Sequence, residues 1–105
     1  MRRYLRLLGL VLFIAMIAQP AMAEKFFIYV YDVDKNAVED ALVKVWQGDN
    51  LIDSGYTDSD GIFATYLNLG TNYIIIATSY NREGVDTSTA ESSRGNRIEI
   101  TIKNK

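Results

Sequence analysis

The 105-residue chain contains no cysteine, no histidine and only one proline. Without cysteine it forms no disulfide, and it lacks the Cys or Cys/His ligand sets that hold structural zinc. Without histidine it lacks the side chain that most often serves as a general base or metal ligand near neutral pH. The length is that of one small domain.

The residue types that remain do not indicate an enzyme. A serine nucleophile needs an adjacent base, and no histidine or evident buried lysine is present to activate one. The acidic residues stand mostly in turn sequences, where solvation is their usual role, so the sequence does not support a pair of carboxylates for acid/base catalysis. We therefore expect no catalytic residues, no metal and no cofactor.

Residues 1–23 have the three parts of a signal peptide. Three arginines precede an uncharged apolar run over residues 7–18, and Ala21 and Ala23 supply the small residues of a cleavage site. Cleavage after Ala23 would leave residues 24–105 as a periplasmic or secreted domain. The alternative is an uncleaved membrane anchor, but the run is shorter than the about 20 apolar residues that a spanning helix needs.

The charge of residues 24–105 argues against nucleic-acid and membrane-surface binding. Residues 1–23 hold three of the eleven basic residues and none of the thirteen acidic ones, so the rest of the chain carries eight against thirteen, a net charge of −5. The eight are scattered, without the cluster of Lys and Arg that contacts phosphates.

The pattern of residues 24–105 predicts an all-β fold. Short runs of alternating apolar and polar residues are separated by Gly, Asn and Asp, and no stretch keeps helical spacing for three turns. Seven strands imply a two-layer sandwich. The predicted strands cover residues 25–32, 41–47, 51–56, 62–68, 73–79, 85–89 and 97–103.

Alternation assigns side chains to the core or to the outside, because successive residues of a strand face opposite ways. We expect a core that includes Ile28 and Val30 of the first strand and Ile98, Ile100 and Ile102 of the last. Several strands are also apolar on the opposite face, which marks a partner or oligomer site if it is exposed. The predicted partner-binding residues are Phe27, Tyr29, Tyr31, Trp46, Ile74 and Ile76.

Three segments resemble the carboxypeptidase regulatory-like domain family. Residues 28–45, IYVYDVDKNAVEDALVKV, are similar to its opening strand, turn and second strand, with Ala37 where the family has Pro and Asp40 where it has Gly. Residues 57–63, TDSDGIF, resemble its Thr-Asp-x-x-Gly-x-Phe turn, and residues 70–76, GTNYIII, its Gly-x-Tyr strand. The resemblance implies a seven-stranded, prealbumin-like (transthyretin-like) β-sandwich with binding or scaffolding work rather than catalysis.

Asp58 and Asp60 leave one metal question open. Their spacing before Gly61 is that of the start of a calcium loop, with Asp32 and Asp34 as outside ligands, although Ile62 stands at the next ligand position. A tight turn explains the same residues through Asx hydrogen bonds and a glycine at positive φ.

Taken together, these features predict a secreted or periplasmic, non-enzymatic module that binds another envelope protein or a second copy of itself. The alternative is a carbohydrate-binding module that stacks sugars on exposed aromatic side chains. A sugar site should have aromatic residues flanked by Asp, Asn or Arg on a concave face or loop rim, whereas a protein site should be flat and apolar.

The signal-peptide prediction has a direct test. Mass spectrometry of the exported protein should give an N-terminal residue of Glu24, because the peptidase recognises the small residues at Ala21 and Ala23. A membrane-bound product that retains residues 1–23 would contradict it.

Overall fold

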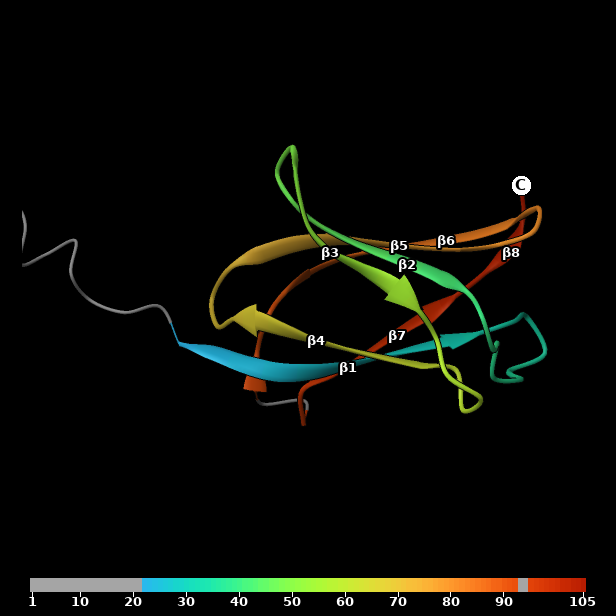
Figure 1. The fold of residues 1–105 in the computed structure, drawn as a ribbon, viewed down its shortest axis with the longest axis horizontal. Coiled ribbons are helices and arrows are strands. Elements are labelled where there is room, and N and C mark those ends of the chain that lie inside the picture. The colour runs from blue at the N-terminus through green and yellow to red at the C-terminus, as the bar shows by residue number, and fades with distance from the viewer. Residues whose placement is uncertain (1–21, 93–94) are drawn as a thin grey trace, which may run out of the picture.

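The structure, a computed structural model, is an all-β sandwich of two sheets packed face to face (Figure 1). It describes residues 22–92 and 95–105, so most of the predicted signal segment lies outside the described residues. No helix in this part of the chain is long and apolar enough to cross a membrane. The strands are β1 (Ala23–Tyr31), β2 (Leu42–Gln47), β3 (Asn50–Tyr56), β4 (Ile62–Asn68), β5 (Asn72–Ser79), β6 (Arg82–Thr89), β7 (Arg97–Thr101) and β8 (Lys103–Asn104).

The chain passes repeatedly between a three-stranded sheet, β4-β1-β7, and a five-stranded sheet, β3-β2-β5-β6-β8. Figure 1 shows them as a lower and an upper layer. Hairpins join β2 to β3 and β5 to β6, and the other connections cross between the layers. β7 runs parallel to β1, whereas every other pair of neighbouring strands in the described residues is antiparallel.

The inward side chains form one core, as alternation predicts. Ile28 and Val30 of β1 are fully buried, and so are Val43 and Val45 of β2. Ile100 and Ile102 are buried with them, whereas Ile98 is partly buried against the same cluster. Removal of this apolar surface from water is the main favourable term in folding.

The last predicted strand, residues 97–103, is two strands. Ile102 separates β7 from β8, and its backbone N–H donates to the carbonyl of Tyr31 in β1. β8 then pairs with Arg82 and Glu83 of β6, in the other sheet. The C-terminal segment therefore ties the two layers together, with the buried Ile102 at the crossing, and Figure 1 shows it rising from the lower layer to the upper.

Two glycines allow the sheets to approach at their edges. A Cβ on Gly55 of β3 would lie 2.4 Å from the ring of Phe63, which fills that space from β4. A Cβ on Gly84 of β6 would lie 2.4 Å from the carbonyl oxygen of Thr101, at the end of β7. A side chain at position 55 would displace the Phe63 ring, and one at position 84 would clash with the backbone of β7.

β6 leaves part of one edge open. It pairs with β5 over its whole length but with β8 only at Arg82 and Glu83, so Val85–Thr89 has no described strand on its other side. Asp86 lies on the inward face of this stretch, opposite the buried Ile75, and accepts a hydrogen bond from Ser88. An inward charge on an edge strand disfavours pairing with another chain.

The core assignment predicts unequal effects at neighbouring residues of β7. Ile100→Ala should lower the free energy of unfolding by about 2–5 kcal/mol, because it removes buried methyl groups and leaves a cavity. Thr101→Ala, on the exposed face, is the matched control and should change it far less. Urea unfolding of both variants measures the difference, and equal losses would mean that the register of β7 is wrong.

Candidate functional site

The six predicted partner-binding residues all face outward, but they lie on opposite sides of the sandwich. Phe27, Tyr29 and Tyr31 line the outer face of β1, in the three-stranded sheet. Trp46, Ile74 and Ile76 lie on the outer face of β2 and β5, in the five-stranded sheet. They therefore form two surfaces.

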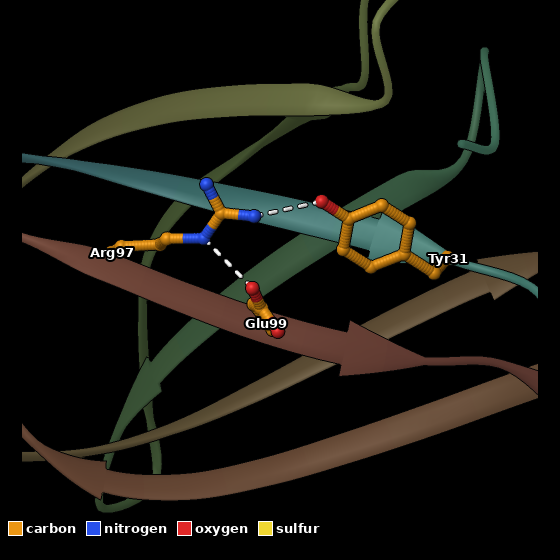
Figure 2. A network of polar contacts seen from close by, with 3 residues as sticks. All are labelled: Tyr31, Arg97 and Glu99. Atoms are coloured by element: carbon orange, nitrogen blue, oxygen red, sulfur yellow. Dashed lines mark hydrogen bonds and ion pairs between the residues drawn. The ribbon is translucent and has the colours of Figure 1, made fainter. Parts of the chain in front are cut away.

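The surface on the three-stranded sheet is built around Arg97 of β7. Its guanidinium carbon lies 3.7 Å from the centroid of the Tyr29 ring, and Tyr29 and Tyr31 stack with centroids 6.3 Å apart. Figure 2 shows that Arg97 reaches across to β1, donating to the hydroxyl of Tyr31 at 2.9 Å and to Glu99 at 2.8 Å. The hydrogen bond from Arg97 to the Glu99 carboxylate raises the pKa of Arg97 further above its usual value.

Phe27, Tyr29 and Tyr31 therefore already make contacts with charged side chains of the same chain. The Arg97 guanidinium covers one face of the Tyr29 ring, and the Lys25 ammonium lies 5.7 Å from the centroid of Phe27. Tyr29 and Tyr31 are half-buried, and Phe27 is 37% exposed. This surface is polar at its centre rather than apolar.

The five-stranded sheet carries the larger apolar surface, which we call the apolar face. Trp46 pairs with Leu51 of β3 and with Ile74 of β5, and Ile76 pairs with Val85 of β6, so these side chains lie on one side of the sheet. Leu51, Ile74 and Val85 are 47%, 39% and 56% exposed. The apolar face comprises Leu42, Trp46, Leu51, Ile74, Ile76 and Val85.

Lys44 is the charged residue within the apolar face. It lies on β2 between Leu42 and Trp46, opposite Ile76 of β5. No described carboxylate is within ion-pair distance of its ammonium group. Its aliphatic stem extends the apolar area, while the ammonium group offers one positive point to a partner.

At one end of the apolar face lies a hollow of about 390 Å³, which we call the tyrosine hollow. Tyr56 and Leu42 face each other across β3 and β2, and Leu42 pairs on its other side with Thr78 of β5. Tyr56 is 65% exposed and Tyr80, in the β5–β6 turn, is 99% exposed. The lining residues are Glu39, Asp40, Leu42, Tyr56, Thr78, Ser79 and Tyr80.

Tyr80 occupies an unusual backbone conformation for an aromatic residue. Its φ is 55°, in the left-handed region that favours glycine, asparagine and aspartate. Such a conformation costs on the order of 1 kcal/mol or more, and here the ring recovers almost nothing by burial. In the turn sequence Ser79-Tyr80-Asn81, Tyr80 is poorly suited to a positive φ. That mismatch was the one feature of the sequence that could have drawn attention to this end of the apolar face.

The carboxylates of Glu39 and Asp40 are uncompensated in the part of the chain that the structure describes. No lysine or arginine there lies within 4.0 Å of either one, and neither side chain accepts a hydrogen bond from a described residue. Asp40 has a φ of 58°. Its backbone N–H donates to the carbonyl of Thr57, which anchors the acidic pair beside the hollow.

The candidate calcium ligands form two separate turns. Asp58 accepts N–H bonds from Asp60 and Ile62, and Asp32 accepts them from Asp34 and Asn36. Among residues 22–92 and 95–105, no group of three or more acidic side chains is placed to hold a metal ion. The pKa of Asp32 is lowered, mainly because its carboxylate accepts a hydrogen bond from the Asn36 backbone.

In comparisons with known proteins, no protein-family model and no curated protein matched the sequence.

The Asp32 turn should make a pH-dependent contribution to stability. Because the folded pKa of Asp32 is lowered, its contribution is complete above the usual carboxyl pKa of about 3.9 and is lost as the pH falls through the folded value. Asp32→Ala should therefore lower the melting temperature at pH 7, and the gap to the wild type should narrow in acid.

The control is Asp32→Asn, which keeps a side-chain oxygen for the turn but has no charge to titrate. Its difference from Asp32→Ala should stay nearly constant with pH. A wild-type advantage that persists unchanged well below the folded pKa would contradict the assignment.

Proposed function

We propose that this chain is a non-enzymatic binding module of the cell envelope that engages another protein through the apolar face of its five-stranded sheet. The observation that carries the proposal is the group of exposed and half-buried apolar side chains on the outer face of β3, β2, β5 and β6. Contiguous exposed apolar surface on a small domain is characteristic of protein interaction sites.

The apolar face fits a protein partner better than the surface around Arg97 does. Its apolar side chains come from neighbouring strands at paired positions, which produces a broad surface without an internal ion pair. Around Arg97, by contrast, the hydrogen bonds to Tyr31 and Glu99 would have to be kept or replaced on binding. Trp46 is the expected anchor because it combines large area with few rotatable bonds.

The envelope location and the family are part of the same proposal. The basic, apolar and small-residue segments of residues 1–23 support export. A carboxypeptidase regulatory-like, prealbumin-like domain is supported by the resemblance of residues 28–45, 57–63 and 70–76 to its motifs. Asp40 stands where those motifs have glycine, and its φ of 58° is one that glycine adopts readily.

Carbohydrate binding through the predicted aromatic residues has weaker support. A sugar ring needs an open aromatic face, but one face of Tyr29 is occupied by the Arg97 guanidinium. Trp46 lies within an apolar row between Leu51 and Ile74, without Asp, Asn or Arg at those paired positions.

The test compares capture by variants of the two outer faces. Immobilised wild-type protein is exposed to an envelope extract of the source organism and, separately, to a polysaccharide panel. Ile74→Ser with Val85→Ser should lower capture of the partner by about ten-fold or more, since burial of each apolar methylene contributes about 0.8 kcal/mol. Both residues are exposed, so the fold should persist.

The matched control is Phe27→Ser with Tyr66→Ser, which removes exposed apolar area from the three-stranded sheet. It should capture the same protein as the wild type. Size-exclusion chromatography of the three proteins identifies a second copy of the chain as the partner if only the Ile74 and Val85 variant loses self-association. Equal capture by all three, or retention by polysaccharide alone, would sink the proposal.

A further inference from the structure

The tyrosine hollow is built from three segments that are distant in sequence. Glu39 and Asp40 come from the loop before β2, Tyr56 from the end of β3, and Tyr80 from the turn between β5 and β6. Leu42 belongs both to the hollow and to the apolar face, so the two surfaces are continuous. A partner lying on the apolar face would therefore reach the hollow at its end.

The hollow is negative in two ways. Its lining residues include two acidic residues, Glu39 and Asp40, and no basic residue. Its two exposed tyrosine rings add the negative face of an aromatic quadrupole, to which ammonium and guanidinium groups are attracted. Both features favour a cation over a neutral or anionic group.

We propose that the tyrosine hollow receives a cationic side chain, arginine or lysine, of the protein that binds the apolar face. The guanidinium or ammonium group would pair with Glu39 and Asp40, while its aliphatic stem would lie against Leu42 and the rings of Tyr56 and Tyr80. This inference rests on the proposed function for the identity of its ligand. It adds the chemistry of the partner, which must combine an apolar surface with a protruding basic residue at one end.

The conformation of Tyr80 agrees with this role. A left-handed φ at a fully exposed aromatic residue is not explained by packing, since the ring is 99% exposed. It does hold the ring at the rim of the hollow. Asparagine adopts the same φ readily, so Tyr80→Asn removes the ring while easing the backbone.

The cation site can be tested without the partner. The exported protein, labelled at tyrosine, is titrated with acetyl-arginine amide and acetyl-lysine amide while the ring resonances are followed by NMR. Acetyl-citrulline amide has nearly the shape of the arginine probe without its charge. Tyr66 is the internal control, because it is 66% exposed, like Tyr56 at 65%, but lies on the other sheet.

The cationic probes should shift the rings of Tyr56 and Tyr80 saturably, with a dissociation constant in the millimolar range, and leave Tyr66 unchanged. Glu39→Gln with Asp40→Asn should weaken binding by about five-fold or more, because it removes the charge while Asn suits the φ of residue 40. Raising the ionic strength should also weaken binding, since the carboxylates are exposed. Tyr80→Asn should weaken it without lowering the melting temperature.

Equal shifts with the citrulline probe, or no saturable shift with either cation, would overturn the inference. A neutral glucan tetrasaccharide is titrated as well. Saturable shifts with this probe alone would also overturn the inference and would make the hollow a sugar site. These outcomes are independent of the capture experiment. If capture depends on Ile74 and Val85 but the hollow binds no cation, the proposed function stands and only this inference is wrong.

Discussion

Thr57, the first residue of the crossing from β3 to β4, is buried against the loop that leaves β1. Four hydrogen bonds join it to residues 38–41 of that loop. Its hydroxyl donates to the carbonyl of Val38 at 2.6 Å and accepts from the N–H of Ala41 at 2.9 Å. Its backbone groups bond Asp40 and Ala41. Each of these buried groups would cost about 1–3 kcal/mol if left unpaired.

This link sets the geometry of one end of the sandwich. Both connections that Thr57 joins pass from one sheet to the other, so their relative position is fixed where the layers meet. Close by, the Val30 N–H donates to the carbonyl of Gly61, whose Cα leaves no space for a side chain. Glu39 and Asp40 are therefore held at the start of β2, and the tyrosine hollow depends on that placement.

The two outer faces use their aromatic residues differently. On the three-stranded sheet, Arg97 links Tyr29, Tyr31 and Glu99, so the rings take part in contacts within the chain. On the five-stranded sheet, Trp46 lies opposite Leu51 and Ile74, and Ile76 lies opposite Lys44 and Val85, without an aromatic–guanidinium contact of the kind that Arg97 makes. The difference arises from β7, which supplies charged residues next to β1, whereas β2 has β-branched and aliphatic neighbours in β5.

Alternation of apolar residues predicted most of the fold. The strand at residues 62–68 has its predicted bounds, and the inward residues of β1 and β2 are those expected, because burial of one strand face imposes a period of two. The division at Ile102 could not be predicted, since residues 97–103 keep the same alternation while the chain changes sheet.

The surfaces were less predictable than the core. The pattern identified outward apolar residues but could not tell that Tyr29 and Trp46 face opposite ways, which depends on the order of strands in each sheet. The tyrosine hollow was missed entirely. It is made where three segments meet, and no local pattern links Glu39 to Tyr80.

The open edge of β6 has a consequence for a domain that also carries an apolar face. A flat sheet with a free edge is a template on which unfolded or neighbouring chains can polymerise into cross-β stacks. A strand added beside Asp86 would have to bury that inward carboxylate, together with its hydrogen bond from Ser88. If the apolar face binds a protein as proposed, the inward charge of Asp86 would let the same sheet keep that face open while it disfavours fibril growth from its free edge.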